Sequence, residues 1–406
     1  MQADRTTPCV AAAAVADSPA SGVSPVVMTA FSFAGAALVS ASSSAATPLY
    51  RLYQQSMHLT PLMITVVFAV YAISLLAALL TVGGLSDHVG RRPVILGGLL
   101  LNAAAMIVFA HAGTVGELIL ARAVQGLCVG TATTAFGAAI LDTNRNQGPL
   151  LNSITAFIGL MLGALGAATL VAFAPDPLHL VYEVLLGSTV AMIILLWWMP
   201  ETVSRAPGAL ASLRPQFVVP LQSRAALIRL TPASVATWAL GGFHMSLMPT
   251  VVATAMGAGS SWIAGGVLPA LLLTATAAVA LFRHWGARRL IVFGTGALSV
   301  GVAVSLLGIQ QRGLGILFAG TMIAGVGFGT SFSGAMRALL PTAEPHQRAG
   351  LLSTFYVLSY LAFSLPAVAA GLAVPTLGLS TVAYVYGAVV IALAAISMVA
   401  SLRSER

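Results

Sequence analysis

The clearest candidates for chemistry lie in a short polar stretch, residues 83–92, between two apolar runs. Asp87 follows Gly83 after three intervening residues, and Gly90 and Arg91 follow Asp87 after two more. A glycine at position 83 lets two helices approach closely, and Gly90 allows a tight turn. Asp87 stands at a helix end, where it can face a helix N-terminus or an arginine. The spacing therefore indicates an electrostatic contact between helix ends.

A second candidate is a charge inside an apolar run. Arg122 and Gln125 are three residues apart, so they share one face of a helix. A charge within a membrane span costs at least a few kcal/mol, and such residues usually face the protein interior. The sequence leaves two interpretations open for Arg122: a functional residue, or a structural arginine that binds backbone carbonyls near the outer surface.

Four further residues are candidate proton or substrate contacts. His244 is the only one of the seven histidines within a span, and its side chain titrates near neutral pH. A hydrogen-bonded core histidine is the alternative. Ser43, Tyr71 and Tyr360 could contact a substrate, or they could face lipid or other helices instead.

Acidic residues are scarce in the apolar runs, because none of the ten Asp and Glu residues falls clearly in the middle of one. A cavity between the helices is expected to be apolar, with hydroxyl groups, Arg122 and His244 as its polar parts. Such a cavity favours neutral or weakly anionic amphiphiles. We expect no metal site and no cofactor other than a proton gradient.

The elements that carry these residues must be membrane helices. Of the 406 residues, 58% are hydrophobic and 7% are charged, whereas about 25% of residues are charged in soluble domains. A soluble fold needs a polar surface that this composition cannot supply. Soluble enzymes, nucleic-acid-binding proteins and disordered proteins are therefore excluded, despite the net charge of +8.

Twelve apolar runs are long enough to cross a bilayer, which takes about 20 residues each. They cover residues 26–48, 61–82, 93–111, 116–141, 150–173, 181–199, 231–253, 262–282, 290–309, 314–336, 350–373 and 380–401. We expect a disordered cytoplasmic tail at 1–25, a six-helix half at 26–199 and a cytoplasmic linker at 200–229. A second six-helix half is expected at 230–402, followed by a cytoplasmic end at 403–406.

The arginines predict the orientation of these spans. Fifteen of the 18 fall in segments that are cytoplasmic when the N-terminus is placed inside, and two fall in outer loops. The positive-inside rule therefore predicts that both termini are cytoplasmic.

The two halves repeat at an offset of about 200 residues. Pro48, which is expected to end the first helix, corresponds to Pro249, and Gly126 and Gly130 correspond to Gly325 and Gly329. Parallel repeats of this kind are typical of transporters that bind substrate between two halves.

The chain resembles the major facilitator superfamily. Residues 83–92 match that family's motif A, with His88 at a usually basic position, and Leu118, Arg122, Gln125 and Gly126 match its motif B. Gly159 and Gly163 match the antiporter motif C, but Ala164 replaces its proline, which stands instead in the second half as Pro366. These small residues and Pro366 are expected to serve helix packing or a hinge.

The resemblance implies an all-α membrane fold of 12 helices in two pseudo-symmetric halves. Asp87 would contact the inner start of the eleventh span in the outward-facing state, and Arg91 would pair with Asp142. The alternative for Asp142 is that it only caps its helix end with Arg145. In the family, the arginine at the position of Arg122 is linked to proton coupling.

The expected function is secondary active export of a small amphiphile driven by protons, with alternating access of the two halves. Proton-coupled uptake of a sugar or organic acid is the alternative, and a membrane sensor or an intramembrane enzyme is a remote one. The expected partners are a small-molecule substrate and the lipid bilayer, with no nucleic acid. We expect a monomer in a bacterial inner (plasma) membrane.

Overall fold

A computed structural model describes residues 23–215, 219–255, 261–344 and 347–403. Most of the expected tail, residues 1–22, and the last residues, 404–406, lie outside the described residues. Every regular element in the described ranges is helical. The helices of the N-terminal half are α1 (Pro25–Met57), α2 (Pro61–Val82), α3 (Ser86–Val89), α4 (Arg91–Ala110), α5 (Val115–Thr143), α6 (Gly148–Phe173) and α7 (Pro177–Leu196).

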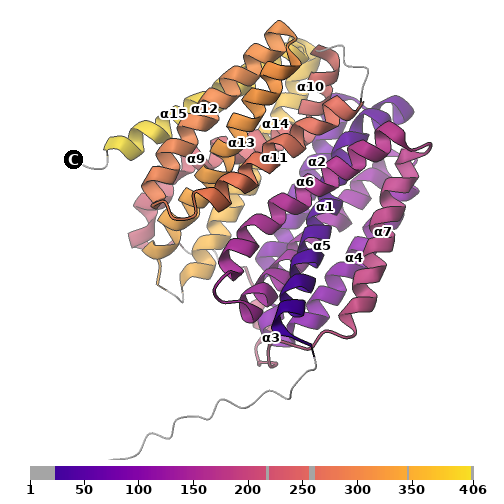
Figure 1. The fold of residues 1–406 in the computed structure, drawn as a ribbon, viewed down its shortest axis with the longest axis vertical. Coiled ribbons are helices and arrows are strands. Elements are labelled where there is room, and N and C mark those ends of the chain that lie inside the picture. The colour runs from indigo at the N-terminus through magenta and orange to yellow at the C-terminus, as the bar shows by residue number, and fades with distance from the viewer. Residues whose placement is uncertain (1–22, 216–218, 256–260, 345–346, 404–406) are drawn as a thin grey trace, which may run out of the picture.

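The C-terminal half follows the short helix α8 (Ala209–Ser212). Its elements are α9 (Leu221–Ser246), α10 (Met248–Ala255), α11 (Ser261–Leu281), α12 (Ala287–Gln311), α13 (Leu314–Leu339), the 3₁₀ turn η1 (Leu340–Thr342), α14 (Arg348–Leu377) and α15 (Leu379–Arg403). Figure 1 shows the two halves side by side, one running from indigo to magenta and the other from red to yellow.

Eleven of the described helices are each long and apolar enough to cross a membrane. The pair α9 and α10, which meet at a bend of 57°, raises the number to 12 when it is counted as one span. The all-helical fold with up to 12 spans predicted from the sequence is therefore confirmed.

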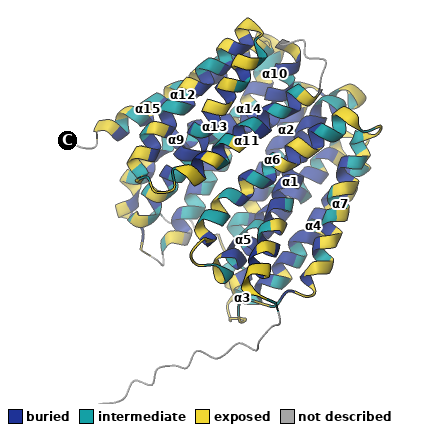
Figure 2. Cartoon of the chain, in the orientation of Figure 1, coloured by how far each residue is buried: buried dark blue, intermediate teal, exposed yellow. Residues whose placement is uncertain are grey.

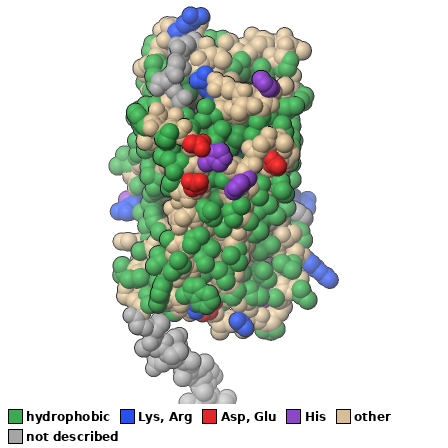
Figure 3. All heavy atoms as spheres, turned by 90° about the vertical axis from the view of Figure 1, so that its right-hand side faces the viewer, with side chains coloured by type: hydrophobic (Ala, Val, Ile, Leu, Met, Phe, Trp, Pro, Cys, Tyr) green, Lys and Arg blue, Asp and Glu red, His purple; other side chains and the backbone are tan. Residues whose placement is uncertain are grey.

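Burial separates central helices from lipid-facing ones (Figure 2). In the most apolar window of α5, 67% of residues are buried inside the protein, against 22% in α7. Hydrophobic side chains predominate on the face shown in Figure 3, and charged ones are few. Helix α5, which carries Arg122, is therefore central, and α7 faces the bilayer.

Glycines allow the closest helix contacts at equivalent places in the two halves. A Cβ atom at Gly130 of α5 would lie 2.6 Å from Cβ of Ala78 on α2. Gly126 of α5 also abuts α2, and Gly325 and Gly329 of α13 abut α11 in the same way. Gly159 and Gly163 of α6 lie against the backbone of α1. The glycine pairs therefore lie where the repeat places them, at packed helix crossings.

The boundaries differ from the sequence prediction at two prolines. Pro48 lies inside α1, which continues to Met57, so the prediction that Pro48 ends the helix is wrong. A membrane helix tolerates an internal proline where neighbouring helices bind the carbonyls it frees. Helix α9 begins at Leu221, inside the segment expected to be linker, directly after the extended backbone of Pro220.

Candidate functional site

Two side chains of α5 bind the backbone of α1 next to the internal proline. Pro48 has no N–H for the preceding turn of α1. Arg122 donates to the carbonyl oxygen of Ser43 at 2.9 Å, and Gln125 Nε2 donates to that of Ser42 at 2.9 Å. The shared face predicted for Arg122 and Gln125 therefore points at the turn of α1 that precedes Pro48.

Arg122 is fully buried and is held by neutral groups. Its guanidinium also donates to Gln125 Oε1 and to the Tyr50 hydroxyl oxygen, both at 2.6 Å. The rings of Tyr50 and Tyr71 lie 5.4 Å from Cζ, and that of Phe109 lies 5.6 Å away. Within the described ranges, no carboxylate pairs with Arg122, and its Nε has no hydrogen-bond partner.

A cluster of aromatic rings lies where the two halves meet. We call it the aromatic cluster, and its members are Phe68 of α2, Phe157 of α6, Trp238 of α9, Phe328 and Phe332 of α13, and Tyr360 and Phe363 of α14. The Phe68 and Phe363 centroids are 4.8 Å apart, and those of Trp238 and Tyr360 are 5.0 Å apart. These separations are typical of stabilising aromatic pairs.

Most of this cluster escaped the sequence analysis, which singled out Tyr360 but not Trp238, Phe332 or Phe363. A signal was present, because Phe328 and Phe332, and Tyr360 and Phe363, recur at helical spacing of three or four residues. Tyr71 lies beside Arg122. Since Tyr71 follows Phe68 by three residues on α2, it links Arg122 to the aromatic cluster.

The hydroxyl groups of α1 bind neighbouring backbone. Ser43 is buried, and its Oγ donates to the Ser40 carbonyl oxygen at 2.7 Å. Ser44 donates to Leu160 of α6 at 2.7 Å, and Thr47 donates across the halves to the Met245 carbonyl oxygen at 3.1 Å. The Met245 carbonyl oxygen lacks its usual helical donor, because Pro249 has no N–H. The hydrogen bond from Thr47 replaces that donor and so stabilises the bend between α9 and α10.

His244 lies one turn before this bend and points into the C-terminal half. Its Nδ1 is 2.9 Å from the Leu240 carbonyl oxygen, which can only accept, so Nδ1 carries the hydrogen. Its Nε2 is buried without a partner among the described residues. The ring borders a cavity of about 30 Å³ that Ser305 and Tyr386 also line. This space is large enough for one water molecule.

The loop after α2 forms the charge cluster that the sequence predicted. Arg91 is 7% exposed and pairs with Asp87 and, at 3.1 Å, with Asp142 at the end of α5. Asp142 also accepts from Thr202 Oγ1 at 3.1 Å. Among the described contacts none joins Asp142 to Arg145, so the helix-capping alternative finds no support. The Asp87 side chain is 62% exposed.

Glu201, to which the sequence assigned no role, caps α4. Its carboxylate accepts from the backbone N–H of Arg91 at 2.7 Å and of Arg92 at 3.1 Å. Gly90 has φ of 101°, and a Cβ there would lie 2.5 Å from Glu201 Oε2. The glycine of the motif is thus required both by its backbone conformation and by the carboxylate beside it.

Glu201→Ala is expected to lower the free energy of unfolding by about 1 to 2 kcal/mol, because two N–H groups at the helix start lose their acceptor. Thermal unfolding of the detergent-solubilised protein measures this change. Glu183→Ala, which removes an exposed acid of α7, is the control and should leave the transition unchanged. Equal effects of the two variants would contradict the capping role.

Comparison with known proteins agrees with this architecture. The sequence profile of the Major Facilitator Superfamily matches residues 32–308, which is more than half of the chain. The chain belongs to the major facilitator superfamily. Membership makes it a multi-pass membrane transporter rather than an enzyme.

Individual relatives match over shorter regions. The inner membrane transport protein YajR of Escherichia coli K12 is 28% identical over 34% of this chain and 31% of its own length. The multidrug resistance protein MdtL of Klebsiella pneumoniae is 26% identical over 35% of this chain and 37% of its own length. The chain thus spans about a third of the length of the bacterial relatives it matches.

Solved structures of the same fold match nearly the whole chain. The nucleoside transporter NupG superposes with a TM-score of 0.67 at 14% identity, covering 93% of this chain and 98% of NupG. The human organic anion transporter MFSD10 superposes with a TM-score of 0.66 at 17% identity, covering 92% of this chain and 99% of MFSD10. At these identities the likeness establishes the fold alone.

Proposed function

We propose that this transporter exports a neutral or weakly anionic amphiphile in exchange for protons. The observation that carries the proposal is the aromatic cluster, to which both halves contribute and which Tyr71 connects to Arg122. Rings from both halves can hold an apolar body at the midplane, and Arg122, which has no carboxylate partner among the described residues, favours a partial or full negative charge. The name of the relative MdtL supports efflux of drug-like compounds.

Contacts between the halves support an alternating-access cycle. Thr65 of α2 lies against Gly371 of α14, and Ala168 of α6 lies against Gly265 of α11. Together with the Phe173–Trp262 contact, they lie at the end opposite the Asp87 loop. Export would require these contacts to open while Asp87 approaches the start of α14.

His244 is the proposed proton carrier. Among the described residues, the buried arginine, histidine, aspartate and glutamate side chains are Arg91, Arg122 and His244. Of these three residue types, only histidine has an ordinary pKa near neutral pH. Its unpartnered Nε2 beside a water-sized cavity is the atom that would receive the proton.

His244→Ala is expected to flatten the dependence of transport on pH between about 5.5 and 7.5, because the imidazole proposed to carry the proton is removed. The measurement is the initial rate of transport in membrane vesicles across this range. Wild-type pH dependence in the variant would reduce His244 to a packing residue.

Trp238→Ala tests the aromatic cluster as the substrate site. We expect roughly tenfold weaker apparent affinity for a neutral lipophilic dye such as Nile red, since one ring at the centre of the cluster is lost. Trp285→Ala is the matched control, because Trp285 contacts Phe282 and Phe293 away from the cluster. An unchanged affinity in Trp238→Ala would place the substrate elsewhere.

A further inference from the structure

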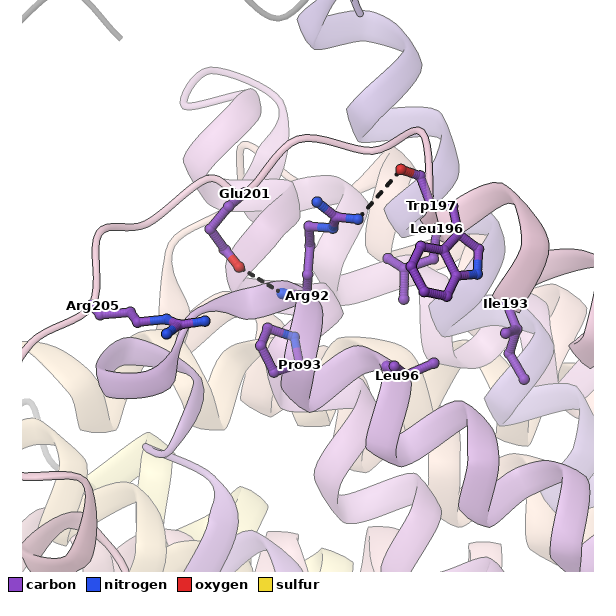
Figure 4. A pocket seen from close by; sticks show the side chains of 8 residues that line it. All are labelled: Arg92, Pro93, Leu96, Ile193, Leu196, Trp197, Glu201 and Arg205. Atoms are coloured by element: carbon purple, nitrogen blue, oxygen red, sulfur yellow. Dashed lines mark hydrogen bonds between the residues drawn. The ribbon is translucent and has the colours of Figure 1, made fainter. Parts of the chain in front are cut away.

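A second pocket lies at the surface between the start of α4 and the end of α7, outside the proposed transport path (Figure 4). Its volume is about 480 Å³. It is lined by Arg92, Pro93 and Leu96 of α4, by Ile193 and Leu196 of α7, and by Trp197, Glu201 and Arg205 of the segment that follows α7. Nothing in the proposed transport cycle uses this pocket.

The pocket offers cationic donors. The Glu201 carboxylate already accepts from the backbone N–H groups of Arg91 and Arg92. Arg92 donates to the Trp197 carbonyl oxygen at 3.3 Å. Arg205 has no ion pair or hydrogen bond to any other residue that the structure describes, and Figure 4 shows its side chain pointing toward α4. Two guanidinium groups therefore face one carboxylate that is already engaged, which leaves the pocket positively charged.

The other wall is apolar and continues into the membrane-facing surface. Leu100 lies one turn beyond Leu96 on α4 and is 54% exposed, and Val190 lies one turn before Ile193 on α7 and is 42% exposed. Trp197 and Trp198 are 71% and 63% exposed at the end of α7. Exposed tryptophans of this kind mark the level of the lipid headgroups.

We propose that this pocket binds an anionic glycerophospholipid of the leaflet on this side of the membrane. The phosphate would accept hydrogen bonds from Arg92 and Arg205, and an acyl chain would run along Leu96 and Ile193 toward the bilayer core. Basic pockets beside membrane helices bind anionic headgroups in this way. The continuous apolar wall selects a lipid over a free phosphate, which would leave that wall uncovered.

The test measures binding of phosphatidylglycerol to the full chain in detergent by native mass spectrometry. Phosphatidylcholine, whose headgroup carries no net charge, is the comparison lipid. We expect tighter binding of phosphatidylglycerol, lowered about fivefold by Arg205→Gln and roughly 25-fold by Arg92→Gln with Arg205→Gln, since each arginine near a membrane surface contributes about fivefold. Arg145→Gln removes an exposed arginine outside the pocket and should leave binding unchanged.

Three results would overturn the proposal. These are equal affinity for the two lipids, equal losses in Arg205→Gln and Arg145→Gln, or displacement of the lipid by free glycerol phosphate at comparable concentration. The last would indicate a site for a soluble anion. Arg205 makes no ion pair or hydrogen bond to another described residue, so the Arg205→Gln variant keeps the test valid if the double variant unfolds.

Discussion

Replacing Arg122 by glutamine is expected to reduce transport by roughly 10- to 100-fold. The guanidinium donates to Ser43, Gln125 and Tyr50, and hydrogen bonds from a charged donor are each worth about 1.5 to 3 kcal/mol. Glutamine cannot reach all three acceptors from the same position. The Ser43 carbonyl oxygen would lose the hydrogen bond from Arg122, and Tyr50 and Tyr71 would lose the cation that they flank. Initial transport rates in vesicles, normalised to the amount of inserted protein, measure the effect.

Arg145→Gln is the matched control for Arg122→Gln. Arg145 is exposed in the loop between α5 and α6, so its loss should change transport less than about twofold. A larger loss in Arg145→Gln than in Arg122→Gln would contradict the functional role of the buried arginine. Equal losses would mean that only the total positive charge matters.

Asp87→Asn is expected to abolish transport while leaving insertion intact. In this structure the exposed Asp87 side chain pairs with the buried Arg91, which keeps Asp142 as a second partner, so the substitution should cost less than about 1 kcal/mol of stability. The reason for the large effect lies in the other state of the cycle. There Asp87 is expected to face the start of α14, where a carboxylate favours a helix N-terminus and an amide does so far less.

The control for Asp87→Asn is Asp176→Asn. Asp176 pairs with His179 at the opposite end of the bundle, so this variant also removes one exposed acid from an ion pair. It should transport at the wild-type rate. Transport by Asp87→Asn at that rate would remove Asp87 from the conformational cycle.

The sequence predicted the parts of the site that depend on local spacing. Residues 83–92 indicated a contact of Asp87 with a helix end or an arginine, the family resemblance implied the pair of Arg91 with Asp142, and the structure places Arg91 between the two acids. Arg122 and Gln125 were predicted to share a face, and both donate to α1. The shared face of Arg122 and Gln125 follows from helix periodicity, and its inward direction follows from the high cost of an unpartnered charge in a membrane.

The remaining parts depend on how distant helices meet. Glu201 caps α4 although it lies more than 100 residues later in the chain. The local sequence at the start of α4 does not indicate which residue accepts from its first backbone N–H groups. The aromatic cluster joins helices of both halves, so single-helix spacing could not identify it. Pro48 was misread as a helix end because α1 continues through it, and the packing of α1 against α5 is not visible in the local sequence.

Proton movement in everted membrane vesicles tests proton-driven export most directly. The lumen is acidified, neutral or anionic lipophilic compounds are added outside, and the luminal pH is followed in wild type and Arg122→Gln. At least one such compound is expected to release luminal protons in wild type and not in Arg122→Gln. An unchanged luminal pH with every amphiphile, together with proton-dependent accumulation of a sugar or organic acid in right-side-out vesicles, would contradict export and establish uptake.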